Sequence, residues 1–313
     1  MLLCWTIYLF LFSFLFGPAG QQVQLEQKAD EKRVDVLIGG ELFTSYHYGP
    51  EFDKPIFHPV KGPDGRTITR GFPMIPDIPG ERKDHPHHQS MWFTYGDVNG
   101  INFWAKNPTP VGSIRHTGFQ TIEGGEKGHL VATADWIAPD GQVLLRETTD
   151  AVFSGDSDNR IVDFKFTLTA QDQKVVFNDT KEGMFGIRVV SSLHEDQTGR
   201  YLSESGAQLE EGVWGKRSPW VALQGEVEGE DVSLVIFNHP ESANYPNYWH
   251  ARAYGLFAAN PFGKKDFEEG SAPLNFSLEP GQSAQFQYRL LVHDGELSAE
   301  ELKEEFSKYS AHR

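Results

Sequence analysis

Residues 130–169 read LVATADWIAPDGQVLLRETTDAVFSGDSDNRIVDFKFTLT, and this stretch decides the fold class. It contains three apolar-rich segments, Leu130–Trp136, Val143–Phe153 and Arg160–Thr169, which are separated by short turns that contain Asp-Gly or Gly-Asp. Short apolar segments bounded by turn residues are typical of β-strands. Because no helical segment lies between them, the stretch predicts consecutive antiparallel strands.

The same pattern extends along the chain in both directions. Residues 34–48 alternate and break at Gly39-Gly40, which predicts a first hairpin. Further strands are predicted at Met91–Tyr95, Gly118–Ile122, Phe185–Ser192, Val221–Val227, Val232–Phe237 and Ala284–His293. Strands at intervals of about ten residues without intervening helices predict an all-β fold, a large antiparallel β-sandwich.

The chain is predicted to end in a short helix. Ser298-Ala-Glu-Glu301 is a capping box, and it places Leu302, Phe306 and Tyr309 on one helix face. No repeat of fixed period, low-complexity tract or polar linker divides residues 25–313. We therefore expect a single large β domain over 25–313.

Composition excludes several classes of function. The 313 residues include 28 Lys and Arg against 44 Asp and Glu, which gives a formal net charge of −16. This charge argues against a nucleic-acid partner, which requires a basic surface. It also disfavours docking on anionic lipid. A hydrophobic content of 39% and an aromatic content of 13% are enough to bury a sizeable core.

The N-terminus predicts export. Leu2–Phe16 is an unbroken apolar run, and small residues follow it up to Ala19. This pattern is typical of a secretory signal peptide, here residues 1–19, and predicts a periplasmic or secreted protein. An uncleaved N-terminal anchor is the alternative. The only cysteine, Cys4, lies inside this segment, and no later segment approaches transmembrane length, so no other membrane contact is expected.

Histidines concentrate in the segment DHPHHQS, residues 84–90. On an extended chain, His85 and His87 would point to one side and His88 to the other. Two histidines at this spacing could hold a divalent metal, with a third ligand from His58, Asp97, His239 or His250. Alternatively, the histidines hydrogen-bond a sugar or a loop backbone. No cofactor other than this metal is expected.

A second candidate lies in KEGMFGIRVV, residues 181–190. As a strand, it would turn Phe185 and Ile187 to the core and place Glu182 and Arg188 on the opposite face, with Gly186 between them. A glycine inside a strand often marks the close approach of a ligand. An ionised Glu182 beside Arg188 could act as a base in a polar cleft. A surface ion pair is the alternative.

A third candidate lies in residues 238–263. His250, Arg252 and Tyr254 fall on one strand face, where a guanidinium could bind a carboxylate in bidentate fashion. The alternative is a structural polar strand with edge aromatic residues.

The loop from Trp214, with Lys216 and Arg217, is interpreted as the rim of a pocket. The chain lacks a P-loop, a dinucleotide fingerprint, a Gly-x-Ser-x-Gly elbow and a His-Glu-x-x-His helix.

Several of these strings resemble a known family. They are FHPVKGPDGRTITR (Phe57–Arg70), DHPHHQSMWFTYGDVNGINFW (Asp84–Trp104), DTKEGMFGIRV (Asp179–Val189), WGKRSPWV (Trp214–Val221), NHPESANYPNYWHARAYGLFAANPFG (Asn238–Gly263) and YRLLVHDGEL (Tyr288–Leu297). Together they are similar to exported bacterial proteins labelled methane oxygenase PmoA-like. A true methane oxygenase subunit spans the membrane several times, so we discount methane oxidation and copper.

The closing strand, residues 278–295, resembles that of galactose-mutarotase-type supersandwiches. This resemblance implies a histidine acid and a glutamate base acting on a sugar in a concave sheet. On this analogy, His88, His250 or His239 would be the acid and Glu182 the base.

The leading hypothesis is an exported, carbohydrate-active enzyme that performs acid–base chemistry on a sugar or glycan. The catalytic candidates are Glu182, His88 and His250. The candidates for binding a small-molecule or glycan substrate are His85, His87, Asp97, Asn99, Arg188, Trp214, Lys216, Arg217, His239, Trp249, Arg252 and Asn260. The alternatives are a non-catalytic glycan-binding protein and a metal-dependent enzyme that uses His85 and His87.

Overall fold

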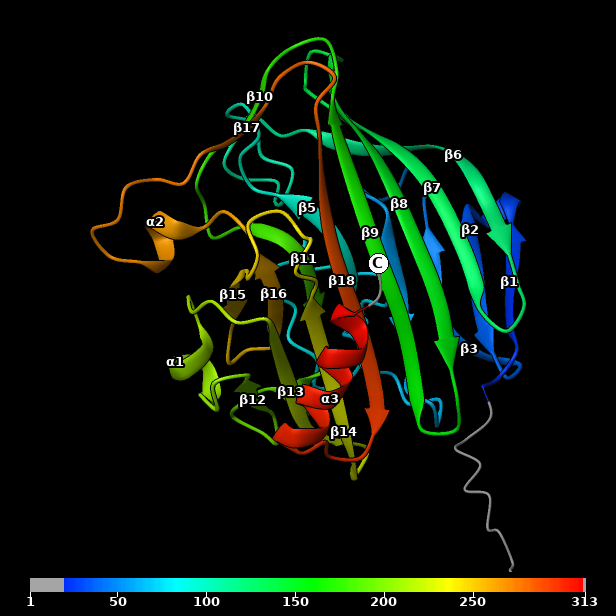
Figure 1. Cartoon of the computed structure of the whole chain (residues 1–313). Coiled ribbons are helices and arrows are strands. Elements are labelled where there is room, and N and C mark those ends of the chain that lie inside the picture. The colour runs from blue at the N-terminus through cyan, green and yellow to red at the C-terminus, as the bar shows by residue number, and fades with distance from the viewer. Residues whose placement is uncertain (1–19, 312–313) are drawn as a thin grey trace, which may run out of the picture.

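The computed structural model describes residues 20–311 and shows two large antiparallel sheets packed against each other (Figure 1). The first sheet has the strand order β1-β2-β3-β4-β5-β11-β16-β15, and the second has the order β12-β13-β14-β18-β9-β8-β7-β6. A small third sheet pairs β10 with β17. The predicted all-β fold, a large antiparallel sandwich, is therefore confirmed.

The bounds of the elements are as follows. The first sheet contains β1 (Val23–Lys28), β2 (Arg33–Ile38), β3 (Glu41–His47), β4 (Ile56–Val60), β5 (Met91–Tyr95), β11 (Gly183–Arg188), β15 (Tyr248–Ala251) and β16 (Leu256–Asn260). The second contains β6 (Ser113–Glu123), β7 (Gly128–Ile137), β8 (Val143–Gly155), β9 (Asn159–Ala170), β12 (Arg200–Ser203), β13 (Trp220–Val227), β14 (Glu230–Asn238) and β18 (Ser283–Asp294). The small sheet contains β10 (Val175–Phe177) and β17 (Phe276–Leu278). The helices are η1 (Ala29–Glu31), η2 (Ser191–Leu193), α1 (Leu209–Val213), α2 (Lys264–Phe267) and α3 (Ala299–Ser310).

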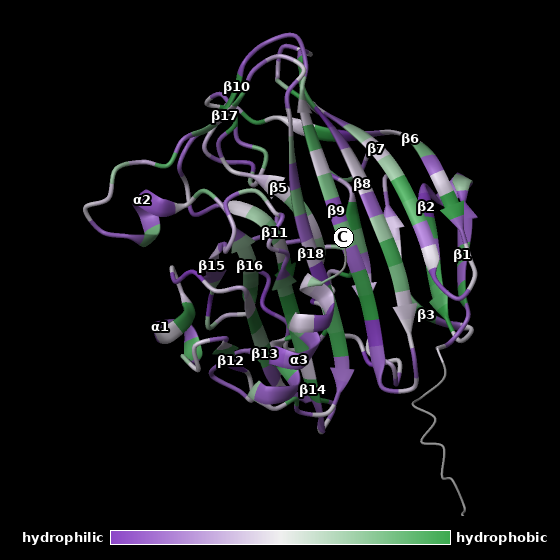
Figure 2. Cartoon of the chain, in the orientation of Figure 1, coloured by the Kyte–Doolittle hydropathy of each residue, from purple (hydrophilic) through white to green (hydrophobic). Residues whose placement is uncertain are grey.

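The strands predicted from residues 130–169 are β7, β8 and β9, and they pair in sequence order. Figure 2 shows apolar and polar residues alternating along them, because one face packs against the first sheet and the other faces solvent. The predicted hairpin joins β2 and β3, and both turn glycines have positive φ, 64° and 87°. The strand predicted over 185–192 is shorter, since β11 ends at Arg188 and η2 begins at Ser191.

The core lies between the two sheets and is rich in aromatic rings. Phe93 of β5 stacks on Phe166 of β9, with ring centroids 4.0 Å apart. Phe185 of β11 stacks on Tyr288 of β18, with centroids 5.1 Å apart. Phe185 and Ile187 face this core, as predicted, so the other side of β11 lies on the outer face of the first sheet.

The C-terminal helix α3 is capped as predicted. The Ser298 hydroxyl accepts from the Glu301 N–H, and the Glu301 carboxylate accepts from the Ser298 N–H at 2.8 Å. Leu302, Phe306 and Tyr309 pack on an apolar cluster on the outer face of the second sheet.

None of the helices within residues 20–311 is long and apolar enough to cross a membrane. The predicted signal peptide and Cys4 lie outside the described residues.

One buried carboxyl group in the core gives a prediction about stability. Glu147 accepts hydrogen bonds from Trp136 Nε1 at 2.8 Å and from the Thr149 hydroxyl at 2.6 Å. Burial raises the pKa of Glu147 to about 7. Because the folded pKa lies above the unfolded one, ionisation of Glu147 removes stability as the pH rises from about 4.5 through 7.

We therefore expect Glu147→Gln to stabilise the protein at pH 8 by up to about 3 kcal/mol, and to have little effect at pH 5. The amide can still accept from Trp136 and can donate to the Thr149 hydroxyl. Urea unfolding of both proteins at the two pH values measures the difference. Glu211→Gln, at an exposed position of α1, is the control and should change stability equally at both. A Glu147→Gln effect that does not depend on pH would contradict the prediction.

Candidate functional site

The segment Asp84–Ser90, here called the histidine turn, folds onto the outer face of the first sheet. It is a turn rather than an extended strand, because the His88 N–H donates to the His85 carbonyl at 2.9 Å and His85 has a φ of 43°. The prediction that His87 and His85 share one face while His88 takes the other is therefore wrong. Instead, the three rings gather, with the His85 and His88 centroids 4.9 Å apart and those of His87 and His88 4.4 Å apart.

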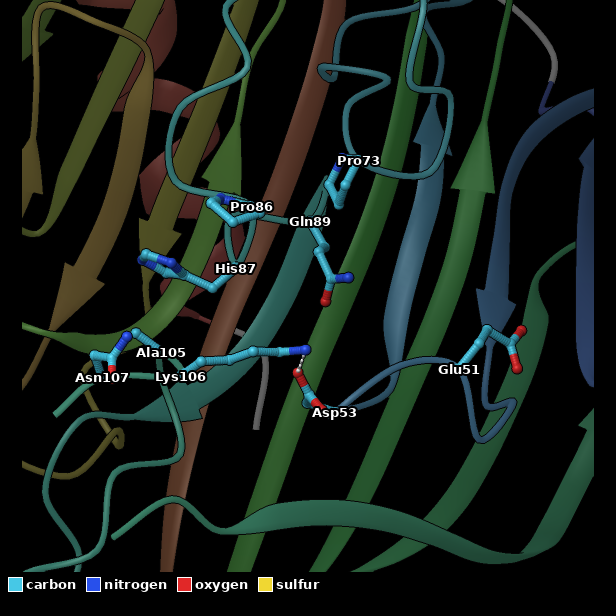
Figure 3. Close-up of a pocket in the computed structure, with 9 residues that line it drawn as sticks. All are labelled: Glu51, Asp53, Pro73, Pro86, His87, Gln89, Ala105, Lys106 and Asn107. Atoms are coloured by element: carbon cyan, nitrogen blue, oxygen red, sulfur yellow. Dashed lines mark ion pairs between the residues drawn. The ribbon is translucent and has the colours of Figure 1, made fainter. Parts of the chain in front are cut away.

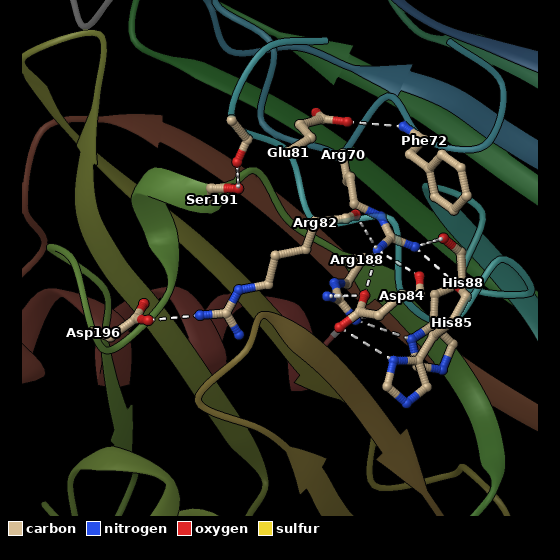
Figure 4. Close-up of polar contacts among 11 residues, drawn as sticks. Arg70, Phe72, Glu81, Arg82, Asp84, His85, His88, Arg188, Ser191 and Asp196 are labelled. Atoms are coloured by element: carbon tan, nitrogen blue, oxygen red, sulfur yellow. Dashed lines mark hydrogen bonds and ion pairs between the residues drawn. The ribbon is translucent and has the colours of Figure 1, made fainter. Parts of the chain in front are cut away.

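Arg70 holds this turn in place (Figure 4). Its guanidinium is buried and donates to the backbone carbonyls of Arg82, Asp84, His85 and His88 at 2.9–3.1 Å. It also pairs with the Asp84 carboxylate at 2.8 Å. Sequence reasoning missed Arg70, because it lies in a Pro- and Gly-rich segment and acts on residues 12–18 positions further along.

Arg188 lies at the centre of the site, and its ion-pair partner is Asp84 rather than Glu182. Its Nη2 donates to Asp84 Oδ1 at 2.7 Å, and its Nη1 donates to His88 Nδ1 at 3.3 Å. Asp84 Oδ2 in turn lies 3.4 Å from His85 Nδ1. Burial acts to raise the pKa of Asp84, but the charges of Arg188, His85 and Arg70 outweigh it and hold that pKa below its usual value.

The space beside Gly186 is filled by protein and holds no room for a ligand. A Cβ built on Gly186 would lie 2.8 Å from the indole ring of Trp92. The glycine thus makes room for the tryptophan, which corrects the prediction of a cleared polar cleft. Glu182 lies at the edge, about one-third exposed, and pairs with Lys181 at 3.2 Å.

A column of stacked rings runs across the site. Trp92 stacks on His88, with centroids 5.4 Å apart, and His88 stacks on His85. On its other side, His85 stacks on Tyr254, with centroids 5.1 Å apart and planes within 3°. The guanidinium of Arg188 lies 4.6 Å from the Tyr254 ring centroid. His85 is thus oriented by rings on both faces and by Asp84 at one edge, and 41% of its side chain is exposed.

The other two catalytic histidine candidates are not accessible. His88 is 1% exposed and His250 is 2% exposed. Burial, with the nearby positive charges, lowers the pKa of His250 to about 3 and that of His88 well below its usual value, so both are neutral at pH 7. His250 Nδ1 donates to the Lys181 carbonyl at 2.9 Å. Both rings are closed off from the surface, whereas His85 is exposed and His87 is partly exposed.

A cavity of about 390 Å³ opens beside His87 (Figure 3). It is lined by Glu51, Asp53, Pro73, Pro86, His87, Gln89, Ala105, Lys106 and Asn107. A second cavity of about 600 Å³ shares Glu51, Pro73 and Gln89 with the first, so the two are adjacent. Behind His87, the buried Lys54 donates to the His87 carbonyl at 3.1 Å, and burial lowers its pKa to about 8.

Arg252 and Trp214 extend the site beyond Tyr254. Arg252 pairs with Glu210 at 2.8 Å, and its guanidinium lies 5.6 Å from the Tyr254 ring and 5.9 Å from the Trp214 ring. Both side chains are partly exposed. Arg217 lies elsewhere, because it donates to the Asn244 and Pro246 carbonyls and stacks on Tyr248. Lys216, in the same loop, is exposed.

Asp97 and Asn99 hold a turn outside the site. Asp97 accepts from the Gly100 N–H and from the Asn178 side chain, both at 2.8 Å. Asn99 donates to the Lys174 carbonyl and accepts from the Val176 N–H. Their side-chain groups are committed to the backbone around β10, so the structure does not bring them to the histidine turn.

Three further candidates are buried away from the turn. Trp249 is fully buried in the main core, where its Nε1 donates to the Ser218 carbonyl. Asn260 is also fully buried, and it donates to the Thr180 carbonyl at 2.8 Å. His239 follows β14 of the second sheet and packs against Tyr309, with centroids 5.1 Å apart. The alternation of apolar residues predicts these strands correctly. It does not distinguish a polar side chain that faces a ligand from one that hydrogen-bonds the backbone.

The histidine pair has no third metal ligand within the described part of the chain. There, no group of three or more His, Cys, Asp or Glu side chains could hold a metal ion. The His85 and His87 rings lie 5.7 Å apart at an angle of 74°, and none of the four residues predicted as a third ligand completes a site with them. The metal hypothesis remains a prediction.

Comparison with known proteins gives a family and a set of distant structural neighbours. The model of DUF6807, a family of unknown function, matches residues 33–307. No curated protein matches the sequence. The galactosidase domain of an alpha-galactosidase-sucrose kinase aligns with a TM-score of 0.47 and 8% identity over 87% of this chain. This chain spans only 42% of that protein.

Two other solved structures are similar. A galactose mutarotase-like protein from Clostridium acetobutylicum aligns with a TM-score of 0.41 and 9% identity, over 88% of this chain and 99% of that one. A variant of a glycoside hydrolase family 97 enzyme from Pseudoalteromonas sp. strain K8 aligns with a TM-score of 0.34 and 10% identity, over 87% of this chain and 35% of that one. Galactose mutarotase-like proteins are thus among the structural neighbours, and the PmoA-like resemblance remains a prediction.

Proposed function

Because this chain belongs to DUF6807, a family of unknown function, its reaction must be inferred from the site, and we propose acid–base chemistry on a sugar or glycan at the His85–Asp84 pair. One observation carries the proposal: His85 is the accessible imidazole of the stacked column, and its Nδ1 lies 3.4 Å from Asp84. Asp84 is itself fixed by two buried arginines, Arg70 and Arg188.

This arrangement suits proton transfer. The carboxylate of Asp84, 3.4 Å from Nδ1 of His85, favours a proton on that nitrogen, which leaves Nε2 to exchange a proton with the ligand. When His85 takes up that proton, the ionised Asp84 stabilises the imidazolium. The two arginines keep Asp84 ionised and in place, which pre-organises the pair before a ligand arrives.

The cavities beside the turn suit a polyhydroxylated ligand. The smaller one alone falls within the size range of small-molecule sites, and together they can take more than one sugar unit. Hydrogen-bonding side chains such as Gln89 and Asn107 line it beside the apolar Pro73, Pro86 and Ala105. Such a mixture matches the hydroxyl groups and C–H faces of a sugar.

Glu182 stays the candidate for the second proton-transfer group. Burial raises the pKa of Tyr254, and the charge of Glu182 adds to that effect, so this carboxylate is within electrostatic reach of the ring column. Its side chain is about one-third exposed, so the carboxylate is open to a ligand. A histidine and a carboxylate on two sides of a sugar could support epimerisation, elimination or glycoside cleavage.

We expect His85→Ala to lower turnover by about 10²–10⁴-fold while the protein stays folded, because this side chain is substantially exposed. The assay is proton NMR in D₂O of the wild-type protein incubated with a panel of sugars and oligosaccharides, which detects exchanged protons and new products. His129→Ala is a matched control, since His129 is 40% exposed and pairs with Asp150 at 2.9 Å on the second sheet.

Three outcomes decide between the hypotheses. Full turnover in His85→Ala would show that His85 is not the acid–base group. Full turnover in Glu182→Gln would show that Glu182 is not the second proton-transfer group. Binding of a glycan without any product over long incubation would instead identify a glycan-binding protein. Turnover that is lost on chelation and restored by a divalent metal would favour the metal-dependent alternative.

A further inference from the structure

The buried charges around the histidine turn do not balance. Lys54, Arg70 and Arg188 are each at most 2% exposed, and they lie on the outer face of the first sheet or against the turn. Among the described residues, the only carboxylate that forms an ion pair with any of them is Asp84. Arg70 and Arg188 share Asp84, and Lys54 has no ion-pair partner among the described residues. Glu81, which accepts from the Gly71 and Phe72 N–H groups and acts electrostatically on Arg70, is a second negative charge nearby. Three buried cations against these two carboxylates leave an excess of one positive charge. This excess is notable in a chain whose net charge is −16.

Three ion pairs at the nearby surface add no net charge of their own. Lys181 pairs with Glu182, Arg252 with Glu210, and Lys106 with Asp53. Each of these pairs is neutral overall, and each lies at the partly exposed rim. These three pairs therefore do not cancel the positive potential of the buried groups.

Donors of the buried groups are also left unused. Arg188 uses two of its nitrogens, towards Asp84 and His88, and its buried Nε has no partner within residues 20–311. The ammonium of Lys54 has three donors and makes one hydrogen bond, to the His87 carbonyl. Burying cations without full pairing is unfavourable unless another group supplies the missing negative charge.

The surface above this charge is formed by His85 and Tyr254. The ring of Tyr254 separates Arg188 from solvent on one side, with the guanidinium 4.6 Å from the ring centroid. The Tyr254 hydroxyl makes no hydrogen bond with any described residue, so it is available as a donor. A negative group resting beside His85 and Tyr254 would lie one ring away from Arg188 and close to Arg252.

We infer that the sugar bound here carries a negatively charged oxyanion, a carboxylate or a sulfate ester, which sits beside His85 and Tyr254. This inference rests on the proposed function and narrows its substrate class to anionic sugars. The oxyanion supplies the charge that the buried cations lack, and it accepts a hydrogen bond from the Tyr254 hydroxyl. The bound anion then places the sugar ring within reach of His85.

The test compares anionic sugars with their neutral parents. Isothermal titration calorimetry at pH 7 would measure glucuronate, glucose 6-sulfate and glucose, together with galacturonate, galactose 6-sulfate and galactose. We expect at least one anionic sugar to bind about tenfold or more tightly than its parent, and about 200 mM NaCl to reduce that preference relative to about 20 mM. The stronger of the uronate and the sulfate ester then identifies the oxyanion.

Two variants tie the preference to the named groups. Tyr254→Phe keeps the ring over Arg188 and removes the donor, so it should weaken binding of the anionic sugar about tenfold and leave that of the neutral parent unchanged. Arg188→Gln should remove the preference, and circular dichroism checks that it folds. Arg82→Met is the matched control, because Arg82 is exposed and pairs with Asp196.

The outcomes separate this inference from the proposed function. Neutral sugars that bind as tightly as anionic ones would overturn the charge inference and leave the proposed function standing. If Tyr254→Phe and Arg188→Gln both bind anionic sugars in preference to neutral ones as strongly as the wild type does, the assigned position of the anion is overturned. Failure of every sugar, neutral or anionic, to bind would overturn both.

Discussion

Replacing Arg70 with methionine is expected to destabilise the protein by about 3–5 kcal/mol and to release the histidine turn. The guanidinium donates to four backbone carbonyls of residues 82–88, and methionine can donate to none of them. The substitution also leaves Asp84 with one arginine in place of two. Buried acceptors that lose their donor cost about 1–3 kcal/mol each when they cannot reach water.

Chemical denaturation measures the loss of stability, and hydrogen exchange of residues 82–90 measures release of the turn. Arg82→Met is the control, because the exposed Arg82–Asp196 pair should contribute less than about 1 kcal/mol. Arg70→Lys should give an intermediate result, since a single ammonium cannot reach all four carbonyls. Unchanged exchange in the turn of Arg70→Met would show that Arg70 does not hold it.

The strands were predictable because their signals are local. In β7, β8 and β9, the apolar pattern and the turn residues lie within about fifteen positions of each other, and nothing distant is needed to interpret them. The same is true of the capping box at Ser298, where the serine and the glutamate are three residues apart. The core-facing side of β11 followed from the same two-residue period.

The site was only partly predictable because its contacts are long-range. The sequence pointed to the histidine segment and to Arg188, but their geometry depends on Arg70, which no local pattern connects to them. Likewise, Gly186 indicates a close approach, and only the structure shows that Trp92 is what approaches it. A glycine in a strand indicates that another group lies close to the backbone, but it does not show whether that group is a ligand or a side chain.

Polar residues in loops and strands gave the most errors. Asp97, Asn99 and Asn260 have the side chains that a sugar site uses, but each bonds the backbone: Asp97 within its own turn, and Asn99 and Asn260 to distant segments of the chain. Asp and Asn are favoured in turns for this reason, so residue type alone cannot separate the two roles. A lack of negative charge beside buried cations indicates a ligand site better than residue type does, but this lack is visible only in the structure.

Acidification is expected to destabilise the protein steeply between pH 6.5 and 4. His58, His88, His194 and His250 are each at most 7% exposed. Burial, the largest cause, lowers the pKa of His58 and His194 to about 4, that of His250 to about 3 and that of His88 well below its usual value. In the unfolded chain the same rings titrate near pH 6.5. As the pH falls below that value, the unfolded state binds protons that the folded state cannot bind, so stability is lost until the folded pKa is reached.

The size of the effect is comparable with the whole stability of a domain. At pH 5, each of the four histidines removes about 2 kcal/mol, against a usual total of about 5–15 kcal/mol. Glu147 acts in the opposite direction over the same range, because its folded pKa is raised, but it is one group against four. Urea unfolding at pH 7, 6 and 5 should therefore show a falling free energy whose slope corresponds to an uptake of about two to four protons on unfolding.

Single substitutions measure how much each histidine contributes to the pH dependence of the free energy of unfolding. His58→Gln should reduce the slope by up to about one proton, because it removes one group that is buried in its neutral form. His129→Gln is the matched control, since the His129 side chain is 40% exposed. A free energy of unfolding that stays constant from pH 7 to pH 5 would mean that these rings gain protons in the folded protein, and that the packing around them admits water.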